Sequence, residues 1–367
     1  MPDPAATTEE APEEASWSGP VGEVRIIPVQ GIPEIVRDCD LGAVIGGAIA
    51  AGGEALRDGD ILAVTSKIAS KALGLTAVRT DKRAVVREQS VRVVAERMTS
   101  TGATRIVEGR HGVVMAGAGI DASNTGPAET LLLLPDDPDE VARELLESLT
   151  AYLRLTLGLA PDLGLVLTDT AGRPWRGGQT DFALGAAGLR VLADYRGCSD
   201  VDGRPLEVTA IAVADEIAAA ADLVKGKLAQ VPVAILRGLG HLVEPGTATG
   251  ARRLVRTGPG DFFAMGHVEA ARAALGVDPG SPLAEAAGIR SVNVESVPDR
   301  LARAVRVALL ADPRGSSVRA ETRELPDGRV EVLMTCPDAY AVGRATARLE
   351  VALWSEGLGE EIVLRDA

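Results

Sequence analysis

The sequence predicts a mixed α/β domain of complex topology, followed by a small α+β domain at the C-terminal end. The chain has 367 residues, which is more than a single hydrophobic core usually organises. Short apolar runs typical of buried strands mix with helical patterns, without a strict strand–helix–strand rhythm. A Gly- and Arg-rich segment over residues 240–260 then precedes the last part of the chain.

These shifts in composition divide the chain into three parts. Residues 1–20 are acidic and rich in small side chains, and they lack the basic and apolar regions of a signal peptide, so we interpret them as a disordered tail. We expect the larger domain over residues 21–262 and the smaller domain over residues 267–367.

The elements of the larger domain follow from its apolar patterning. Apolar runs bounded by Gly, Pro or polar residues predict strands; they cover 24–30, 60–64, two short runs within 105–116, 163–167, 206–215 and 231–240. Apolar residues at helical spacing predict helices; they cover 41–56, 81–98, 137–158 and 216–228. The helix over 137–158 begins with acidic residues, which suit the positive end of its dipole.

The smaller domain has fewer but clear signals. Helical spacing predicts helices over 298–312 and 339–359. Strands are expected within 318–336, and the Pro-Asp-Gly sequence at 326–328 predicts a hairpin turn between them.

Composition excludes several classes of function. The net charge is −14, which argues against a non-specific nucleic-acid or membrane-surface binder. No apolar run approaches the roughly 20 residues of a membrane span. The three cysteines are widely spaced and odd in number, so we expect a reduced, cytoplasmic protein without a disulfide framework. The common nucleotide motifs, GxxxxGK[ST] and GxGxxG opening a helix, are absent.

Four polar clusters follow predicted strands: 31–35, 65–71, 121–126 and 168–181. Taken alone, the first three have simple structural interpretations. "GIPEI" at 31–35 indicates a turn, "TSKIASK" at 65–71 is either a strand end with solvated lysines or a binding segment, and "DASNTG" at 121–126 is either a local turn or a binding segment.

The fourth cluster, "TDTAGRPWRGGQTD" at 168–181, points more strongly to function. Asp169 and Thr170 leave a buried strand and offer oxygen donors suited to Mg²⁺ or Mn²⁺. Arg173 and Arg176 offer guanidinium groups suited to phosphate or carboxylate. The alternative is a loop held together by Arg–Asp pairs.

Five segments together resemble the coenzyme F420:L-glutamate ligase family, in order and in spacing. They are "PVQGIPEI", "DGDILAVTSKIASK", "AGIDASNTG", "TDTAGRPWRGGQTDFALGAAGL" and "VTAIAVADEIAAAADLVKGKLAQVPVAILRG". The resemblance covers about two thirds of the chain and is similar to the form in which the ligase is fused to a nitroreductase-like flavin domain. It implies GTP-dependent attachment of L-glutamate to F420-0, with γ-linked tail extension, a requirement for Mg²⁺ or Mn²⁺, help from K⁺, a mixed α/β fold and a homodimer.

The resemblance also implies roles for individual residues. The segment that lines the guanine nucleotide matches Ile32, Pro33, Glu34 and Ile35. Further nucleotide contacts match Ser66, Lys71 and Asn124, and Lys225 falls in a segment with nucleotide contacts in related proteins. The divalent-metal ligands match Asp121, Asp169 and Thr170. We expect Lys71, Arg173 and Arg176 to supply positive charge during catalysis.

The C-terminal part departs from the family pattern. Residues 267–367 resemble a nitroreductase fold that is shortened through its middle, and only Arg290 of the expected phosphate-binding arginines is present. We therefore expect no FMN binding there. Two other functions stay open: a nucleotide-binding regulatory protein without turnover, and an FMN-dependent reductase of dehydro-F420-0.

Overall fold

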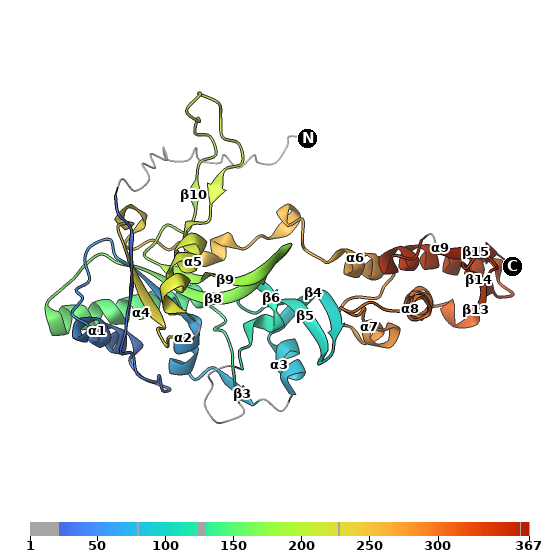
Figure 1. Cartoon of the computed structure of the whole chain (residues 1–367), viewed down its shortest axis with the longest axis horizontal. Coiled ribbons are helices and arrows are strands. Elements are labelled where there is room, and N and C mark those ends of the chain that lie inside the picture. The colour runs from blue at the N-terminus through green and yellow to red at the C-terminus, as the bar shows by residue number, and fades with distance from the viewer. Residues whose placement is uncertain (1–21, 79–80, 123–129, 227, 360, 367) are drawn as a thin grey trace, which may run out of the picture. The chain divides into compact units, whose positions relative to one another are not determined.

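The chain folds into two compact units, each described here by itself. The computed structural model describes residues 22–78, 81–122, 130–226, 228–359 and 361–366 (Figure 1). The first unit comprises residues up to 80 and 120–256, and the second comprises 81–119 and 257 onwards. The predicted disordered tail over residues 1–20 lies outside the described residues.

The first unit is organised by a five-stranded sheet in the order β1-β12-β2-β8-β9. The strands are β1 (Arg25–Pro28), β12 (Val233–Arg237), β2 (Ile61–Thr65), β8 (Gly164–Arg173) and β9 (Arg176–Ala187). Strands β2 and β8 are parallel, and every other neighbouring pair in this sheet is antiparallel. The mixed sheet with its helices confirms the predicted mixed α/β class.

Helices cover both faces of this sheet (Figure 1). Helix α5 (Val213–Lys225) packs its apolar side on one face, in a core that includes Ile61 and Val166. Helix α4 (Pro138–Tyr152) covers the other face, where its first residue lies over Gly185 so closely that a Cβ there would be 2.2 Å from the Pro138 carbonyl oxygen. Helix α1 (Leu41–Ala51) packs against α4.

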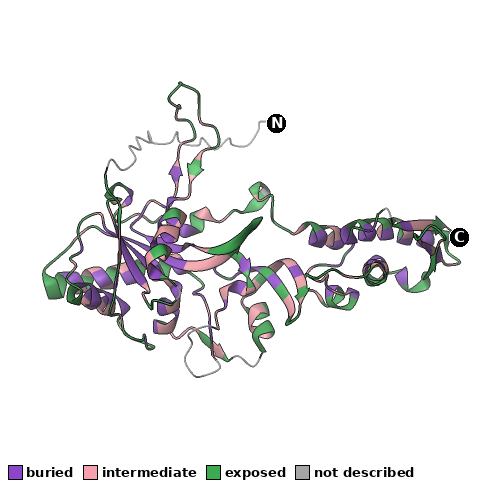
Figure 2. Cartoon of the chain, viewed as in Figure 1, coloured by how far each residue is buried: buried purple, intermediate pink, exposed green. Residues whose placement is uncertain are grey.

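Shorter elements complete the first unit. They are α2 (Ser66–Ala72), an antiparallel pair of β3 (Thr76–Val78) with β7 (Thr130–Leu132), and a second antiparallel pair of β10 (Ala193–Asp194) with β11 (Ala210–Ile211). Figure 2 shows that burial is concentrated in the central strands and that the β8–β9 ribbon becomes exposed toward its tip. The polar end of that ribbon is therefore available for function.

The second unit contains two three-stranded sheets. Helix α3 (Lys82–Glu88) leads into an antiparallel meander of β4 (Ser90–Thr99), β5 (Gly102–Gly109) and β6 (Val114–Ala116). The C-terminal part adds β13 (Arg319–Glu324), β14 (Val330–Thr335) and β15 (Ile362–Asp366). It also adds helices α6 (His267–Ala274), α7 (Pro282–Ala287), α8 (Val297–Leu310) and α9 (Ala339–Glu356). The likeness of residues 267–367 to a nitroreductase stays a prediction.

A buried ionic cluster ties three helices of the second unit together. Glu356, at the end of α9, is fully buried and accepts hydrogen bonds from Arg272 of α6 (Nη2–Oε1 2.6 Å) and Arg303 of α8 (Nη2–Oε2 2.6 Å). Arg303 also pairs with Glu295. Burial acts to raise the pKa of Glu356, but the hydrogen bonds from the two guanidinium groups outweigh it and the pKa lies below its ordinary value.

Two predicted elements are wrong. The helix expected over 81–98 ends at Glu88, and residues 90–99 form β4. The β-branched residues Val91, Val93 and Val94 favour a strand, and pairing with β5 stabilises it. The strand expected over 206–215 shrinks to Ala210–Ile211, because α5 begins at Val213 and its alanine-rich start has high helix propensity.

The predicted strand end at 65–71 is also wrong, since helix α2 begins at Ser66 directly after β2. The cluster at 168–181 is not an irregular loop but the outer part of the β8–β9 ribbon. Among the described residues, no helix is both long enough and apolar enough to cross a membrane.

Candidate active site

The candidate site lies where β2 ends and its parallel pairing with β8 stops. Thr65 pairs with Thr168 in the register, so the residues that follow, Ser66 and Asp169, emerge side by side. The Ser66 hydroxyl donates a hydrogen bond to Asp169 Oδ1 at 3.2 Å, and Ser66 is only 2% exposed. The carboxyl ends of adjacent parallel strands are a common position for ligand sites in α/β folds. The structure thus brings together two residues that are 103 positions apart in sequence.

The Asp169 carboxylate is buried and has two other carboxylates nearby. Its pKa is raised to about 6, mainly by burial and to a smaller extent by the negative charges of Asp181 and Asp121. The backbone N–H of Thr170 and the Ser66 hydroxyl only partly oppose this shift. Since negative charge accumulates here, a bound cation would relieve the repulsion between these carboxylates.

Two lysines of α2 form ion pairs at the same end of the sheet. Lys67 Nζ lies 2.6 Å from Asp121 Oδ2, and Lys71 forms an ion pair with Glu34. The spacing of four residues on a helix explains why both ammonium groups point to one side. Lys67 was missed as a site residue, because this spacing becomes informative only when residues 66–72 are recognised as helical.

The backbone of Asp121 is fixed by two hydrogen bonds with Leu132 (N–O distances 3.1 and 2.9 Å). Asp121 therefore reaches the site from a chain segment outside the main sheet. Asn124, the predicted nucleotide contact that follows it, lies outside the described residues.

The segment expected to line the nucleotide follows β1. Ile35 is buried and anchors the segment, whereas Pro33 and Glu34 are exposed and Ile32 is half-buried. Of these four residues, Glu34 is brought into contact with another predicted site residue, Lys71.

A second polar network occupies the opposite face of the ribbon, because successive residues of a strand point to alternate faces. Thr170 Oγ1 donates to Asp181 Oδ1 at 2.6 Å, and Thr168 Oγ1 donates to Asp181 Oδ2 at 3.0 Å. The ammonium group of Lys225, from the end of α5, lies 2.7 Å from Asp181 Oδ2 and 2.6 Å from Thr168 Oγ1.

This network changes what the structure indicates for Lys225. Lys225 and Asp181 are each 4% exposed, so they form a buried ion pair that holds α5 to the ribbon. The nucleotide contact expected of Lys225 stays a prediction. Sequence reasoning did not select Asp181 as a site residue. The signal that could have found it is its position as the final Asp of the 168–181 cluster.

We expect Thr170→Val to destabilise the cation-free protein by about 1.5–3 kcal/mol, because Asp181 loses a hydrogen-bond donor in a partly buried site. Thr170→Ser keeps the hydroxyl and should stay within about 0.5 kcal/mol of the wild type. Urea unfolding monitored by circular dichroism measures both. An undiminished stability of Thr170→Val would contradict a positioning role for this hydroxyl.

The two predicted catalytic arginines lie at the tip of the ribbon, away from the Asp169 carboxylate. Arg173 and Arg176 face each other across a two-residue turn, and both are exposed. Arg173 lies four positions along the strand from Asp169, a span of about 13 Å. Neither arginine forms an ion pair with a carboxylate among the described residues, so the alternative of a loop stitched by Arg–Asp pairs is not observed.

The turn itself is unusual. Trp175 is 82% exposed and has a φ of 59°, in the left-handed region that a turn of this kind normally assigns to glycine. A bulky side chain there costs roughly 1–2 kcal/mol. Such a conformation at an exposed tip is typical of a functional segment.

The donor set fits an open magnesium site. Mg²⁺ is commonly held by one or two protein carboxylates, with substrate phosphates and water completing its octahedron. Asp121 and Asp169 are two such carboxylates, and their mutual charge already raises the pKa of Asp169. Within the described ranges, no group of three or more His, Cys, Asp or Glu residues is arranged to hold a metal.

Comparison with known proteins shows that the chain matches a family of ligases. The family model for F420-0:gamma-glutamyl ligase matches residues 31–238, and the chain belongs to this family. The resemblance stated from the sequence motifs is thereby confirmed.

Individual relatives agree with the family match. The chain is 38% identical over 255 residues to a coenzyme F420:L-glutamate ligase of Halobacterium salinarum, covering 64% of this chain and 93% of that protein. It is 36% identical over 258 residues to the enzyme of the same name from Methanothermobacter thermautotrophicus, covering 65% of this chain and 98% of that protein. A third, from Methanopyrus kandleri, is 38% identical over 226 residues, covering 57% of this chain and 86% of that protein.

Proposed function

We propose that this chain is a GTP-dependent ligase that joins the amine of L-glutamate to the lactyl carboxylate of F420-0. Its membership of the ligase family supports this, as do the names of its relatives. One observation carries the proposal: the first two residues of α2, Ser66 and Lys67, contact the carboxylates of Asp169 and Asp121 respectively. The site offers oxygen donors for a cation together with ammonium groups for phosphate.

The proposed reaction has two steps because a carboxylate is a poor electrophile. A carboxylate oxygen of F420-0 attacks the γ-phosphorus of GTP, and GDP leaves with the bridging oxygen. The glutamate nitrogen then attacks the acyl carbon, phosphate leaves, and the nitrogen loses a proton. Lys67 and Lys71 would stabilise the negative charge that develops on the phosphoryl oxygens. No covalent intermediate on a side chain is needed.

We assign the divalent cation, Mg²⁺ or Mn²⁺, to Asp121 and Asp169. The ligand role expected of Thr170 stays a prediction, because its hydroxyl donates to Asp181 on the opposite face of the ribbon. When bound, the ion would neutralise the triphosphate and orient its terminal phosphate. We propose in addition that K⁺ increases the rate and that further glutamates are added through γ-links. Replacing K⁺ by Na⁺ in the assay tests the first of these statements.

Mass spectrometry tests the function directly. F420-0 is incubated with the protein, GTP, Mn²⁺ and L-glutamate, and the products are separated by mass. The expected result is a species heavier by one glutamate minus water, with GDP and phosphate formed in equal amounts; later additions report tail extension. GDP without a heavier product, or no reaction at all, would overturn the proposal.

Lys71→Ala should raise the apparent KM for GTP by about tenfold and leave the KM for glutamate within twofold. The reason is that Lys71 presents a point charge to phosphate and is mostly buried beside Glu34. Lys82→Ala, an exposed lysine at the start of α3, is the matched control and should match the wild type. A rise in the glutamate KM instead would assign Lys71 to the acceptor site.

We further propose that the second unit works without bound FMN and that the chain forms a homodimer. The contacts of three arginines support the absence of FMN. Arg272 and Arg303 neutralise buried Glu356, and Arg290 donates to the Ser355 carbonyl oxygen. A colourless purified protein without a flavin absorption band is the expected result. Light scattering measures the oligomeric state.

A further inference from the structure

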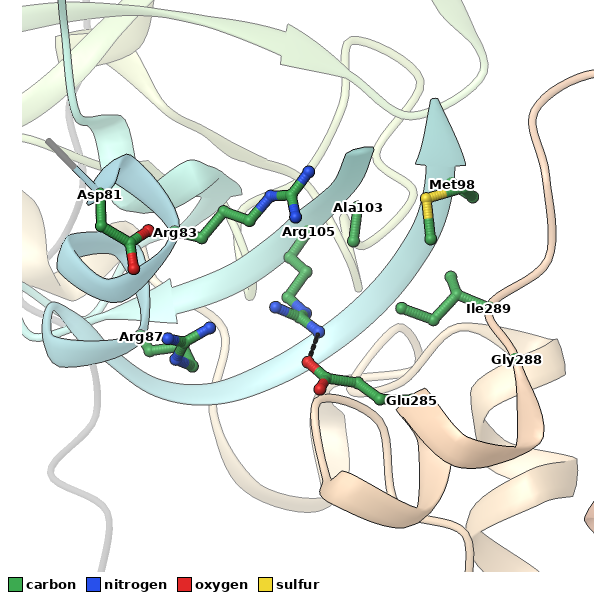
Figure 3. Close-up of a pocket in the computed structure, with 9 residues that line it drawn as sticks. All are labelled: Asp81, Arg83, Arg87, Met98, Ala103, Arg105, Glu285, Gly288 and Ile289. Carbon is green, nitrogen blue, oxygen red and sulfur yellow. Dashed lines mark hydrogen bonds and ion pairs between the residues drawn. The ribbon is translucent and has the colours of Figure 1, made fainter. Parts of the chain in front are cut away.

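The second unit contains a cavity of about 460 Å³ between α3, the β4–β5 hairpin and α7 (Figure 3). This volume lies in the range of small-molecule sites. None of its lining residues belongs to the first unit, which holds the candidate active site. Its lining residues are Asp81, Arg83, Arg87, Met98, Ala103, Arg105, Glu285, Gly288 and Ile289.

Two arginines of α3 line the cavity four residues apart, on one side of the helix (Figure 3). Like charges at this spacing repel each other and destabilise a helix. Neither Arg83 nor Arg87 forms an ion pair with any described carboxylate, although the chain as a whole carries a net charge of −14. No ion pair with a described carboxylate therefore balances the charges of these two guanidinium groups.

The position of Arg83 is nevertheless well defined. Its Nη2 donates to the Thr101 carbonyl oxygen at 2.9 Å, and the guanidinium lies over Gly102, the first residue of β5 after the β4–β5 turn. Gly102 has a φ of 112°, and a Cβ there would lie 1.4 Å from Arg83 Nη2. The missing side chain of this glycine thus leaves room for Arg83, whose guanidinium group is held in position beside the cavity.

A third guanidinium, that of Arg105, is 6% exposed and is held by two carboxylates. Its Nε donates to Glu96 Oε2 at 3.0 Å and its Nη2 to Glu285 Oε1 at 3.1 Å. The other acid of the lining, Asp81, accepts a hydrogen bond from the Ala84 N–H as the cap of α3. The lining therefore carries three guanidinium groups and two carboxylates, and neither carboxylate forms an ion pair with Arg83 or Arg87.

We propose that this cavity binds a small molecule with two or more oxyanion groups, either carboxylates or phosphates. Arg83 and Arg87 supply the principal charge-assisted hydrogen bonds, and guanidinium geometry suits both kinds of anion. Met98, Ala103 and Ile289 provide an apolar wall for the carbon skeleton of the ligand. The site is independent of the proposed ligase reaction.

Isothermal titration of the full chain at fixed ionic strength tests this, with pyrophosphate and propane-1,2,3-tricarboxylate as separate probes. We expect saturable one-to-one binding of at least one probe, and the stronger of the two identifies the anion class. The double variant Arg83→Gln/Arg87→Gln should weaken that binding at least tenfold. Arg319→Gln, which removes an exposed arginine of the same unit outside the cavity, should change it less than twofold.

Two further results decide the matter. Lys71→Ala alters the candidate active site of the other unit and should leave this binding unchanged, which separates the cavity from any anion binding at the ligase site. Absence of saturable binding of either probe would overturn the proposal. Equal weakening by the double variant and by Arg319→Gln would also overturn it, since the binding would then reflect non-specific charge attraction.

Discussion

Replacing Asp169 by asparagine is expected to lower the rate of glutamate ligation by about a hundredfold or more. The carboxylate accepts a hydrogen bond from Ser66, and asparagine removes the negative charge that the proposed divalent cation requires. Steady-state assays over a range of Mn²⁺ concentrations measure the loss. Asp202→Asn, at an exposed position of the same unit, is the matched control and should retain full activity.

Stability distinguishes this loss from misfolding. Because burial raises the pKa of Asp169 to about 6, above its ordinary 3.8, the folded state holds this proton more tightly than the unfolded state. The contribution of Asp169 to stability therefore falls as pH rises from about 4 through about 6, and it stays low at neutral pH. Cation-free Asp169→Asn should then unfold at an equal or higher temperature than the wild type at pH 7. Near-normal turnover in this variant would refute the metal assignment.

Glu356→Ala is expected to destabilise the second unit by about 3–5 kcal/mol. Glu356 is fully buried between Arg272 and Arg303, so its removal leaves two buried guanidinium groups without their shared carboxylate. Urea unfolding monitored by circular dichroism measures the effect. Glu350→Ala, an exposed position on the same helix, should change stability by no more than about 0.5 kcal/mol.

A compensated variant separates the loss of charge balance from the loss of packing. Arg272→Met, Arg303→Met and Glu356→Leu made together replace the ions by apolar groups and should recover most of the lost stability. The lowered pKa of Glu356 adds a pH signature: the stabilisation by the carboxylate is lost as pH falls below its ordinary value of 4.5. A wild-type stability that does not fall in acid more than that of the compensated variant would contradict this account.

Elements with strong internal patterns were predictable from sequence. Helix α4 agrees with the predicted helix because the cap residue Asp137 and acidic residues stand at the start of a regular helical spacing of apolar residues. Helix α9 agrees with its prediction because it has the same kind of apolar spacing. The hairpin between β13 and β14 follows from Asp327-Gly328, where Gly328 has a φ of 81°. In contrast, residues 90–99 have an ambiguous local pattern, because their apolar spacing also fits a helix. Pairing with β5 stabilises the strand, and a local pattern does not show that pairing.

The sequence by itself determined the family, and its motifs predict Asp169 as a metal ligand and Ser66 and Lys71 as nucleotide contacts, since these residues stand in segments with fixed order and spacing. Only the tertiary structure decided which groups meet. It paired Lys67 with Asp121 and buried Lys225 against Asp181. The physical reason is that ion pairing and burial depend on strand register and on the side of a helix that faces the sheet. Both are fixed by packing between segments far apart along the chain.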